Sequence, residues 1–303
     1  MNKKIFTPET DGFYGAWYPC QNSTKSAFIL VHKMAEGRMA EGPAKWFLQQ
    51  GISVMLLAPM PEDNHEFNEY PIDWVQRSID WMKEQGIERF SIGGQSQTAM
   101  LSLLAASKIP DITLTLAFTP NDFLMEATKT IKNVERPLGK SYATWRGEAL
   151  PYLVFTDRGD ALTARMKKEG KETGNMLYGR GIFKDSEEAH TLTEAEYIKV
   201  EDIKGKVICF GAKDDAMWDT EMYINRMEKR LEKKTHDCQF EKHIYEHGTH
   251  YVLPQGVIKG MLPASSFLIG IMFKAGKTHK KECLKTRLDI ERIVVDALAE
   301  WKE

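Results

Sequence analysis

The chain has 303 residues, of which 42% are hydrophobic and 28% are charged, and its formal net charge is −2. These values are typical of an ordinary soluble protein, and the length allows one large α/β domain or two small ones, each with a substantial core. Because acidic and basic residues are interspersed and nearly balanced, the sequence predicts neither a nucleic-acid partner nor an anionic membrane partner.

Targeting segments and disulfides are not predicted either. Lys3 and Lys4 are not followed by an apolar run, so we expect no secretory signal, and no stretch approaches the roughly 20 apolar residues of a membrane helix. The four cysteines show no C-x-x-C spacing, which favours reduced thiols. We therefore expect a cytoplasmic protein.

In the first part of the chain, apolar runs alternate with helical patterns. Strands are predicted at residues 12–18, 27–31, 52–57, 90–92 and 112–118, and helices at 41–50, at 72–85 and from residue 98. Several of these strands are apolar on both faces, as in parallel sheets that helices cover on both sides. We therefore expect an α/β fold with a mostly parallel sheet, which binds ligands at the carboxyl ends of its strands.

This alternation fails between residues 121 and 200, where the chain is rich in Lys, Glu, Gly and Met and shows no clear strand series. We interpret the segment as a cap over the site, with a surface excursion as the alternative. The sheet is predicted to resume at 206–210 and 239–245, with helices at 219–233, 264–274 and 284–301. We expect residues 1–303 to form a single domain that carries the cap at 121–200.

The most informative stretch spans residues 89–107. A short apolar strand is followed by a glycine turn, Gly94-Gln95-Ser96-Gln97-Thr98, and then by an apolar helix. This is the context of a nucleophile elbow, in which a strained turn exposes a serine beside the positive end of a helix. Threonine stands where the second glycine of G-x-S-x-G is usual. A helix N-cap serine is the plainer alternative, and a phosphate-binding loop is disfavoured because no Lys-Ser/Thr follows.

A serine nucleophile needs a base, and that base needs an acidic partner. After Ser96, the chain offers the pair Asp214-Asp215 behind one predicted strand and His250 behind the next. Each could be structural, the aspartates as helix caps and the histidine as a core residue. All three groups nevertheless follow strands in the order Ser, Asp, His that hydrolases of this kind use.

Two backbone N–H groups are candidates for an oxyanion hole. One belongs to Gln97, directly after the serine, and the other to Lys33 or Met34, in the loop that follows the strand at 27–31. His32, in the same loop, is expected to fix the loop's conformation.

A competing zinc motif must also be weighed, because residues 243–247 match H-x-x-E-H. That chemistry places both histidines on one face of a helix. Here the segment alternates like a strand and meets Gly248 at once, so His243 and His247 are expected to diverge. We predict no metal site, and His247 is interpreted as a polar neighbour of the candidate site.

With these residues assembled, the chain resembles the α/β-hydrolase superfamily, and more closely the acyl-CoA thioester hydrolase / bile acid-CoA:amino acid N-acyltransferase C-terminal domain family. The resemblance covers about residues 12–275 and rests on 92–97, 211–218, 245–251, and 111–113 with 120–122. It implies a triad of Ser96, Asp215 and His250. Asp215 is chosen by its spacing to Trp218, whereas counting from Gly211 would select Asp214. The acyltransferase members use cysteine as nucleophile, so serine favours hydrolysis.

The sequence thus predicts a serine hydrolase that cleaves a carboxylic ester or an acyl-CoA-like thioester through an acyl-enzyme on Ser96. His250 would be the base, and Asp215 would orient it. The expected partner is a small acyl ester or thioester, and no metal or organic cofactor is implied. The alternatives are an acyltransferase with an amine or alcohol acceptor, and a non-catalytic binding protein on the same fold.

Overall fold

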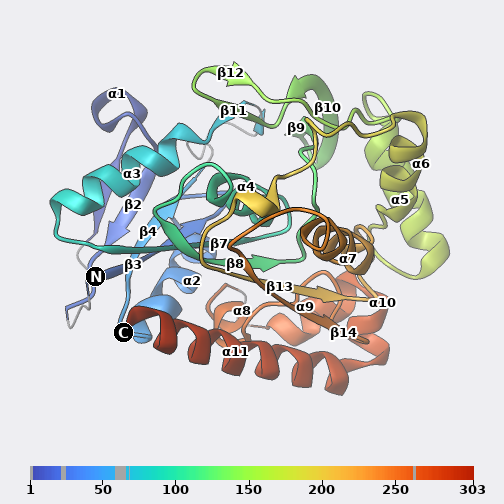
Figure 1. Ribbon diagram of the computed structural model, residues 1–303. Coiled ribbons are helices and arrows are strands. Elements are labelled where there is room, and N and C mark those ends of the chain that lie inside the picture. The colour runs from blue at the N-terminus through green and yellow to red at the C-terminus, as the bar shows by residue number, and fades with distance from the viewer. Residues whose placement is uncertain (1–2, 22–24, 59–65, 68, 262–263) are drawn as a thin grey trace.

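The computed structural model describes the chain except for residues 1–2, 22–24, 59–65, 68 and 262–263 (Figure 1). In the described part, eight strands form one sheet in the order β1-β2-β4-β3-β7-β8-β13-β14. These strands are β1 (Lys4–Phe6), β2 (Gly15–Tyr18), β3 (Ser26–Val31), β4 (Ser53–Leu57), β7 (Arg89–Gln95), β8 (Ile112–Phe118), β13 (Lys206–Ala212) and β14 (Gln239–Tyr245). β2 is antiparallel to β1 and β4, and the pairs from β4 to β14 are parallel. The predicted α/β class is confirmed.

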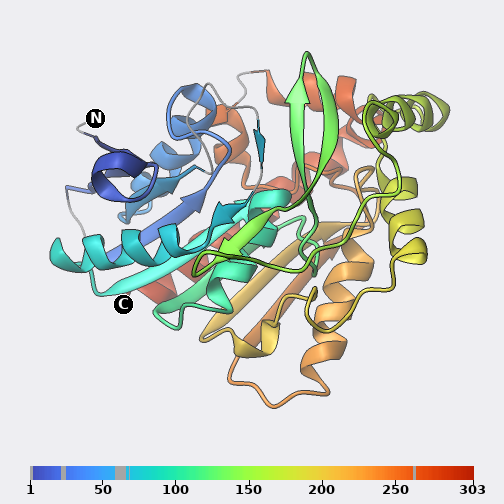
Figure 2. The same ribbon diagram turned by 90° about the horizontal axis from the view of Figure 1, so that it is seen from above.

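Helices cover both faces of this sheet, so β3 and β4 are buried along their whole length, as their continuous apolar runs predict (Figures 1 and 2). One face packs against α3 (Asp73–Glu84), α4 (Gln97–Ala106) and α7 (Thr220–Leu231). The other packs against α2 (Arg38–Gln49), α8 (Gln255–Met261) and α11 (Lys280–Lys302). Two hydrophobic layers therefore hold the sheet in place.

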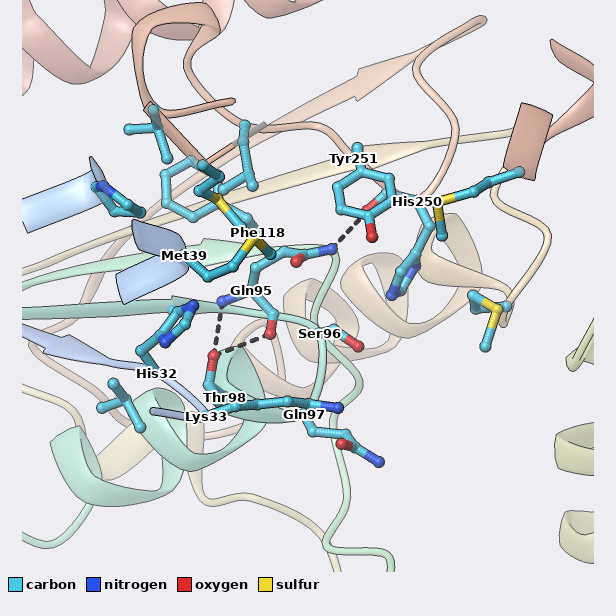
Figure 3. A pocket seen from close by; sticks show the side chains of 18 of the residues that line it. His32, Lys33, Met39, Gln95, Ser96, Gln97, Thr98, Phe118, His250 and Tyr251 are labelled. Carbon is cyan, nitrogen blue, oxygen red and sulfur yellow. Dashed lines mark hydrogen bonds between the residues drawn. The ribbon is translucent and has the colours of Figure 1, made fainter. Parts of the chain in front are cut away.

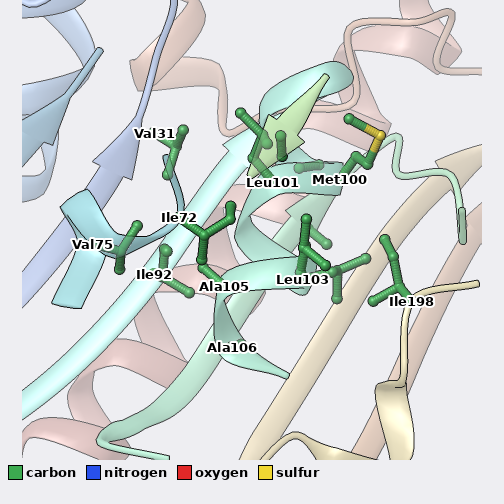
Figure 4. Close-up of a cluster of buried hydrophobic side chains, with 14 of the residues drawn as sticks. Val31, Ile72, Val75, Ile92, Met100, Leu101, Leu103, Ala105, Ala106 and Ile198 are labelled. Carbon is green, nitrogen blue, oxygen red and sulfur yellow. The ribbon is translucent and has the colours of Figure 1, made fainter. Parts of the chain in front are cut away.

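Helix α4 lies at the centre of the first layer. Of its ten residues, nine are buried, which explains why its sequence is apolar all round. Figure 4 shows Leu101, Leu103 and Ala105 among side chains from the sheet and from neighbouring segments. The helix that follows Ser96 is therefore fixed on every side.

The segment 121–200 differs from its prediction, because it contains strands of its own. β9 (Glu126–Ile131) and β10 (Val134–Ser141) form an antiparallel hairpin that β5 (Glu66–Phe67) extends, and β11 (Ala143–Trp145) pairs with β12 (Glu148–Ala149) and β6 (Tyr70–Pro71). The segment also holds α5 (Ala161–Thr173) and α6 (Arg180–Ala189). The hairpin was missed because β10 is largely exposed or half-buried and carries Pro137 and Gly139, which weaken the strand pattern.

The hairpin turn follows ordinary stereochemistry. Its two central residues, Lys132 and Asn133, have φ values of 50° and 61°. A two-residue turn with positive φ at both positions matches the twist of the flanking strands.

An ion pair between a half-buried arginine and a buried aspartate links this segment to α7. Arg226, on α7, makes two hydrogen bonds of 2.6 Å to the buried carboxylate of Asp122 and one of 2.7 Å to Glu187 on α6. Burial raises the pKa of Asp122 despite the hydrogen bonds from Arg226, which act to lower it. Two separate parts of the inserted segment, at Asp122 and at Glu187, therefore share one cationic partner on α7.

The C-terminal helices differ modestly from prediction. The helix expected at 264–274 is divided into α9 (Ser265–Met272) and α10 (Lys274–Thr278), because Phe273 between them has extended backbone angles. Helix α11 begins four residues before its predicted start at 284. The short elements β1, α1 (Pro8–Asp11), α8 and a 3-10 turn (Val200–Asp202) were not predicted. Among the described residues, no helix combines the length and apolar character needed to cross a membrane.

Candidate active site

Ser96 lies at the sharp turn between β7 and α4. Its φ of 62° and ψ of −127° put it in a region that residues with side chains rarely adopt. The N–H of Ser96 donates to the carbonyl of Phe118 at the end of β8, at 2.8 Å. The strained backbone conformation that the sequence predicts at Ser96 is therefore present, and a hydrogen bond to strand β8 stabilises it.

The glycines before the serine are required by close backbone contacts. A Cβ on Gly94 would lie 2.6 Å from the carbonyl oxygen and from Oγ1 of Thr98, and one on Gly93 would lie 2.7 Å from the carbonyl oxygen of Leu116. Both distances are too short for real atoms, so side chains at either position would force the turn open.

Thr98, which departs from the glycine pattern, has a definite role in the turn. Its hydroxyl accepts the N–H of Gln95 and donates to the carbonyl of Gln95, both at 2.9 Å (Figure 3). The side chain therefore satisfies both backbone groups of the residue that precedes the serine. The sequence pattern alone indicates only that a glycine is missing, not this role.

His250 follows β14 and is paired with Asp215, which follows β13. Both carboxylate oxygens of Asp215 lie 2.9 Å from Nδ1 of His250. The carboxylate is buried and also accepts hydrogen bonds from the hydroxyl of Thr220 and, at 2.8 Å, from the N–H of Met217. With the carboxylate so held, the ring orientation is fixed.

Asp214, the alternative acid, has different partners. Its Oδ1 accepts the N–H groups of Gly248 and Thr249 at 3.0 and 2.8 Å, and its Oδ2 lies 3.1 Å from Nδ1 of His247. Asp214 therefore braces the loop that carries His250, whereas Asp215 contacts the His250 ring itself. His247 is a neighbour of the site, as expected.

Ser96 and His250 line the same pocket, and Figure 3 shows the imidazole extending towards the serine. In the described structure no hydrogen bond joins the Ser96 hydroxyl to the ring, a bond that often tightens only when substrate is bound. The serine turn and the loop that carries His250 are nevertheless linked, because the side-chain N–H of Gln95 donates to the carbonyl of His250 at 2.7 Å. This tether was not predicted.

The loop after β3 carries His32 and two candidates for the oxyanion hole, Lys33 and Met34. The N–H of Met34 donates to Nδ1 of His32 at 3.2 Å, so it is already engaged. Burial lowers the pKa of His32, which favours the neutral ring that accepts this bond. His32 thus shapes the loop, as expected. Lys33 and Gln97 line the pocket beside Ser96, and Gln97 is the first residue of α4, where N–H groups lack helical partners.

The pocket has a volume of about 420 Å³ and is largely apolar. Seven methionines line it, namely Met34, Met39, Met166, Met176, Met217, Met261 and Met272, together with Phe47, Phe118, Trp218 and Phe273. Two of these methionines, Met166 and Met176, come from the inserted segment 121–200. Methionine side chains are flexible and polarizable, so such a wall adapts to apolar groups of different shape.

The zinc alternative is not supported by the geometry. Residues 239–245 form strand β14, and His243 contacts Glu241, whereas His247 contacts Asp214. In the part of the chain that the structure describes, no group of three or more His, Cys, Asp or Glu residues is arranged to hold a metal ion.

The strand order, the strained serine after β7, and the aspartate and histidine after β13 and β14 define an α/β-hydrolase fold. The family model described as BAAT / acyl-CoA thioester hydrolase C terminal matches residues 65–255, and the chain belongs to this family. The predicted resemblance is confirmed, and the protein is an enzyme of the hydrolase class.

Solved structures with a similar course of the chain include hydrolases from several organisms. An esterase of Pyrococcus furiosus has 14% identity and a TM-score of 0.48, covering 88% of this chain and 95% of that one. A putative dienelactone hydrolase of Klebsiella pneumoniae has 10% identity and a TM-score of 0.49, covering 94% and 98%. No curated protein sequence matches the chain.

Proposed function

We propose that the protein is a serine hydrolase that cleaves a carboxylic ester or a thioester through an acyl-enzyme on Ser96. The observation that supports this most directly is the buried Asp215, which holds Nδ1 of His250 with both oxygens while the ring and Ser96 line one pocket. A carboxylate in this position selects the tautomer whose other nitrogen is free to accept a proton.

In the proposed reaction, each of these residues has one role. Nε2 of His250 takes the hydroxyl proton as Oγ of Ser96 attacks the acyl carbon, and the N–H groups of Gln97 and Lys33 stabilise the oxyanion that forms. His250 then gives the proton to the departing alkoxide or thiolate, leaving the acyl group on Ser96. Water attacks this ester with His250 as base, which releases the acid and restores the serine.

The pocket supports an apolar acyl group as the part of the substrate that is held. Its lining is largely apolar and includes seven methionines and five aromatic side chains, whereas most of its polar residues belong to the serine turn and the loops that carry Lys33 and His250. We also propose that residues 1–303 act as one catalytic domain in which residues 121–200 form a cap, because Met166 and Met176 of this segment line the pocket. The description of the family supports a thioester as one form of the substrate.

The neighbouring aspartates provide a matched test. With p-nitrophenyl esters and acyl thioesters of graded chain length, Asp215→Asn should lower kcat by about 10⁴-fold, because it presents the wrong tautomer of His250. Asp214→Asn should lower kcat less than about tenfold, because it alters only the bracing of the loop. Ser96→Ala should remove the acyl-enzyme route, so that only the small rate enhancement from substrate binding and the oxyanion hole remains.

Equal losses in the two aspartate variants would contradict the proposed triad. Hydrolysis at no chain length by the wild type would favour a binding protein, and product formation only with an added amine or alcohol would favour acyl transfer.

A further inference from the structure

Helix α9 exposes large apolar side chains to solvent. Phe267 is 68% exposed and Ile271 is 56% exposed. They are four residues apart and therefore share one face of the helix. Contiguous exposed apolar groups of this size commonly mark an interaction surface.

Basic residues follow directly along the chain. Residues 274–285 contain five lysines and one glutamate. The lysines are all exposed, and with the described residues none forms an ion pair: they are Lys274, Lys277, Lys280, Lys281 and Lys285. This segment is strongly cationic, although the whole chain has a net charge of −2.

The start of α11 combines both features on one stripe. Lys281, Leu284, Lys285 and Leu288 are spaced three and four residues apart, and all four are exposed. Helices α9, α10 and α11 contact one another, and Figure 1 shows α10 beside the N-terminal end of α11. We call the exposed residues of 267–288 the α9–α11 surface.

This surface adjoins the rim of the apolar pocket. Met272 and Phe273, at the end of α9, line the pocket. Met176 also lines it, is half exposed, and donates its N–H to the carbonyl of Met272 at 2.8 Å. Ile271, on the exposed face of α9, is therefore followed directly in the chain by residues that line the pocket.

We propose that the α9–α11 surface docks on the surface of an anionic lipid bilayer. Apolar side chains flanked by lysines are the combination with which interfacial helices bind such membranes, each lysine adding attraction to the lipid phosphates. A second copy of the chain is disfavoured as the occupant, because a two-fold contact would set the lysines of the two copies against one another. The net charge of the whole chain gives no sign of such a partner, because the positive charge of residues 274–285 is cancelled by the net negative charge of the other residues.

Vesicle sedimentation tests this without any substrate, and so independently of the proposed hydrolysis. The wild type should bind vesicles of phosphatidylglycerol and phosphatidylcholine, bind vesicles of phosphatidylcholine alone at least tenfold more weakly, and be released by high salt. Phe267→Ser/Ile271→Ser and Lys274→Gln/Lys277→Gln/Lys281→Gln/Lys285→Gln should each weaken binding about tenfold or more. Thermal unfolding confirms that each variant is folded.

Matched controls exist elsewhere on the surface. Ile131→Ser/Val154→Ser removes apolar residues of 42% and 40% exposure in the inserted segment, and Lys233→Gln/Lys234→Gln removes two exposed lysines after α7. These variants should bind like the wild type. The proposal is overturned if the wild type binds neither vesicle, if the controls lose as much binding as the α9–α11 variants, or if the wild type is a dimer that Phe267→Ser/Ile271→Ser converts to a monomer.

Discussion

At the scale of single residues, the serine turn is held by contacts that differ from the usual glycine pattern. Ser96 has a positive φ, which costs energy unless its surroundings enforce it. Here Thr98 closes the turn from one side by bonding both backbone groups of Gln95, and Gln95 in turn bonds the carbonyl of His250. Gln95 thus links the turn that carries Ser96 to the loop that carries His250.

Replacing Thr98 tests this role. Thr98→Val keeps the shape of the side chain but leaves the N–H and carbonyl of Gln95 without their partner, which should cost about 1–3 kcal/mol of unfolding free energy. The turn would relax, so we expect kcat to fall about tenfold with little change in KM. Urea unfolding and steady-state kinetics measure both. Thr98→Ser retains the hydroxyl and should restore most of kcat, so equal losses in the two variants would contradict the role.

The same residues show what sequence could and could not predict. Ser96, Asp215 and His250 could be proposed as a triad because each lies in the turn or loop that follows a strand, and parallel strands bring their ends together. The choice between Asp214 and Asp215 depends on which side chain points to His250, and two adjacent turn residues do not reveal that by pattern. The contacts of Gln95 and Thr98 depend on turn geometry that has no periodic signal.

At the scale of elements, the inserted segment is bound to the core by specific polar contacts as well as by apolar packing. The Arg226 guanidinium bonds Asp122 and Glu187 and lies over the rings of Phe123, Tyr197 and Tyr223. The main sheet was predictable because buried parallel strands form continuous apolar runs. The hairpin β9–β10 was not, because its strands are partly exposed and mixed in composition.

Removing Arg226 should loosen this attachment. Arg226→Met leaves the buried carboxylate of Asp122 without its cation, and we expect a loss of about 3–5 kcal/mol in unfolding free energy. Lys229→Met, on the exposed side of the same helix, should change stability by less than about 0.5 kcal/mol. Urea unfolding compares the two variants, and a similar small effect from both would show that the ion pair does not fasten the segment.

Across the whole molecule, acidic and basic residues are nearly equal in number, but they are unevenly distributed over the surface. Acidic and basic side chains are paired around α7, whereas the lysines near α10 have no such partners among the described residues. Net charge therefore predicts solubility but not which surface binds a partner.

Paired carboxylates also predict how stability changes with pH. Hydrogen bonds from Arg230 and Lys199 hold the pKa of Glu194 at about 2, below its ordinary value of 4.5. Because the pKa is lowered in the folded state, this stabilisation is present above about pH 5 and is lost as the pH falls towards 2. The urea midpoint of the wild type should therefore exceed that of Glu194→Gln at pH 7, and the difference should shrink on acidification. Glu172→Gln, which removes an exposed carboxylate that forms no ion pair with the described residues, is the control.

The proposed reaction requires Ser96 to be the nucleophile of this hydrolase. Intact-mass analysis after treatment with a fluorophosphonate probe tests it most directly, on the wild type and on Ser96→Ala. We predict a single adduct on the wild type, none on Ser96→Ala, and loss of ester hydrolysis in step with labelling. An unlabelled wild type, or a Ser96→Ala variant labelled to the same extent, would contradict the claim.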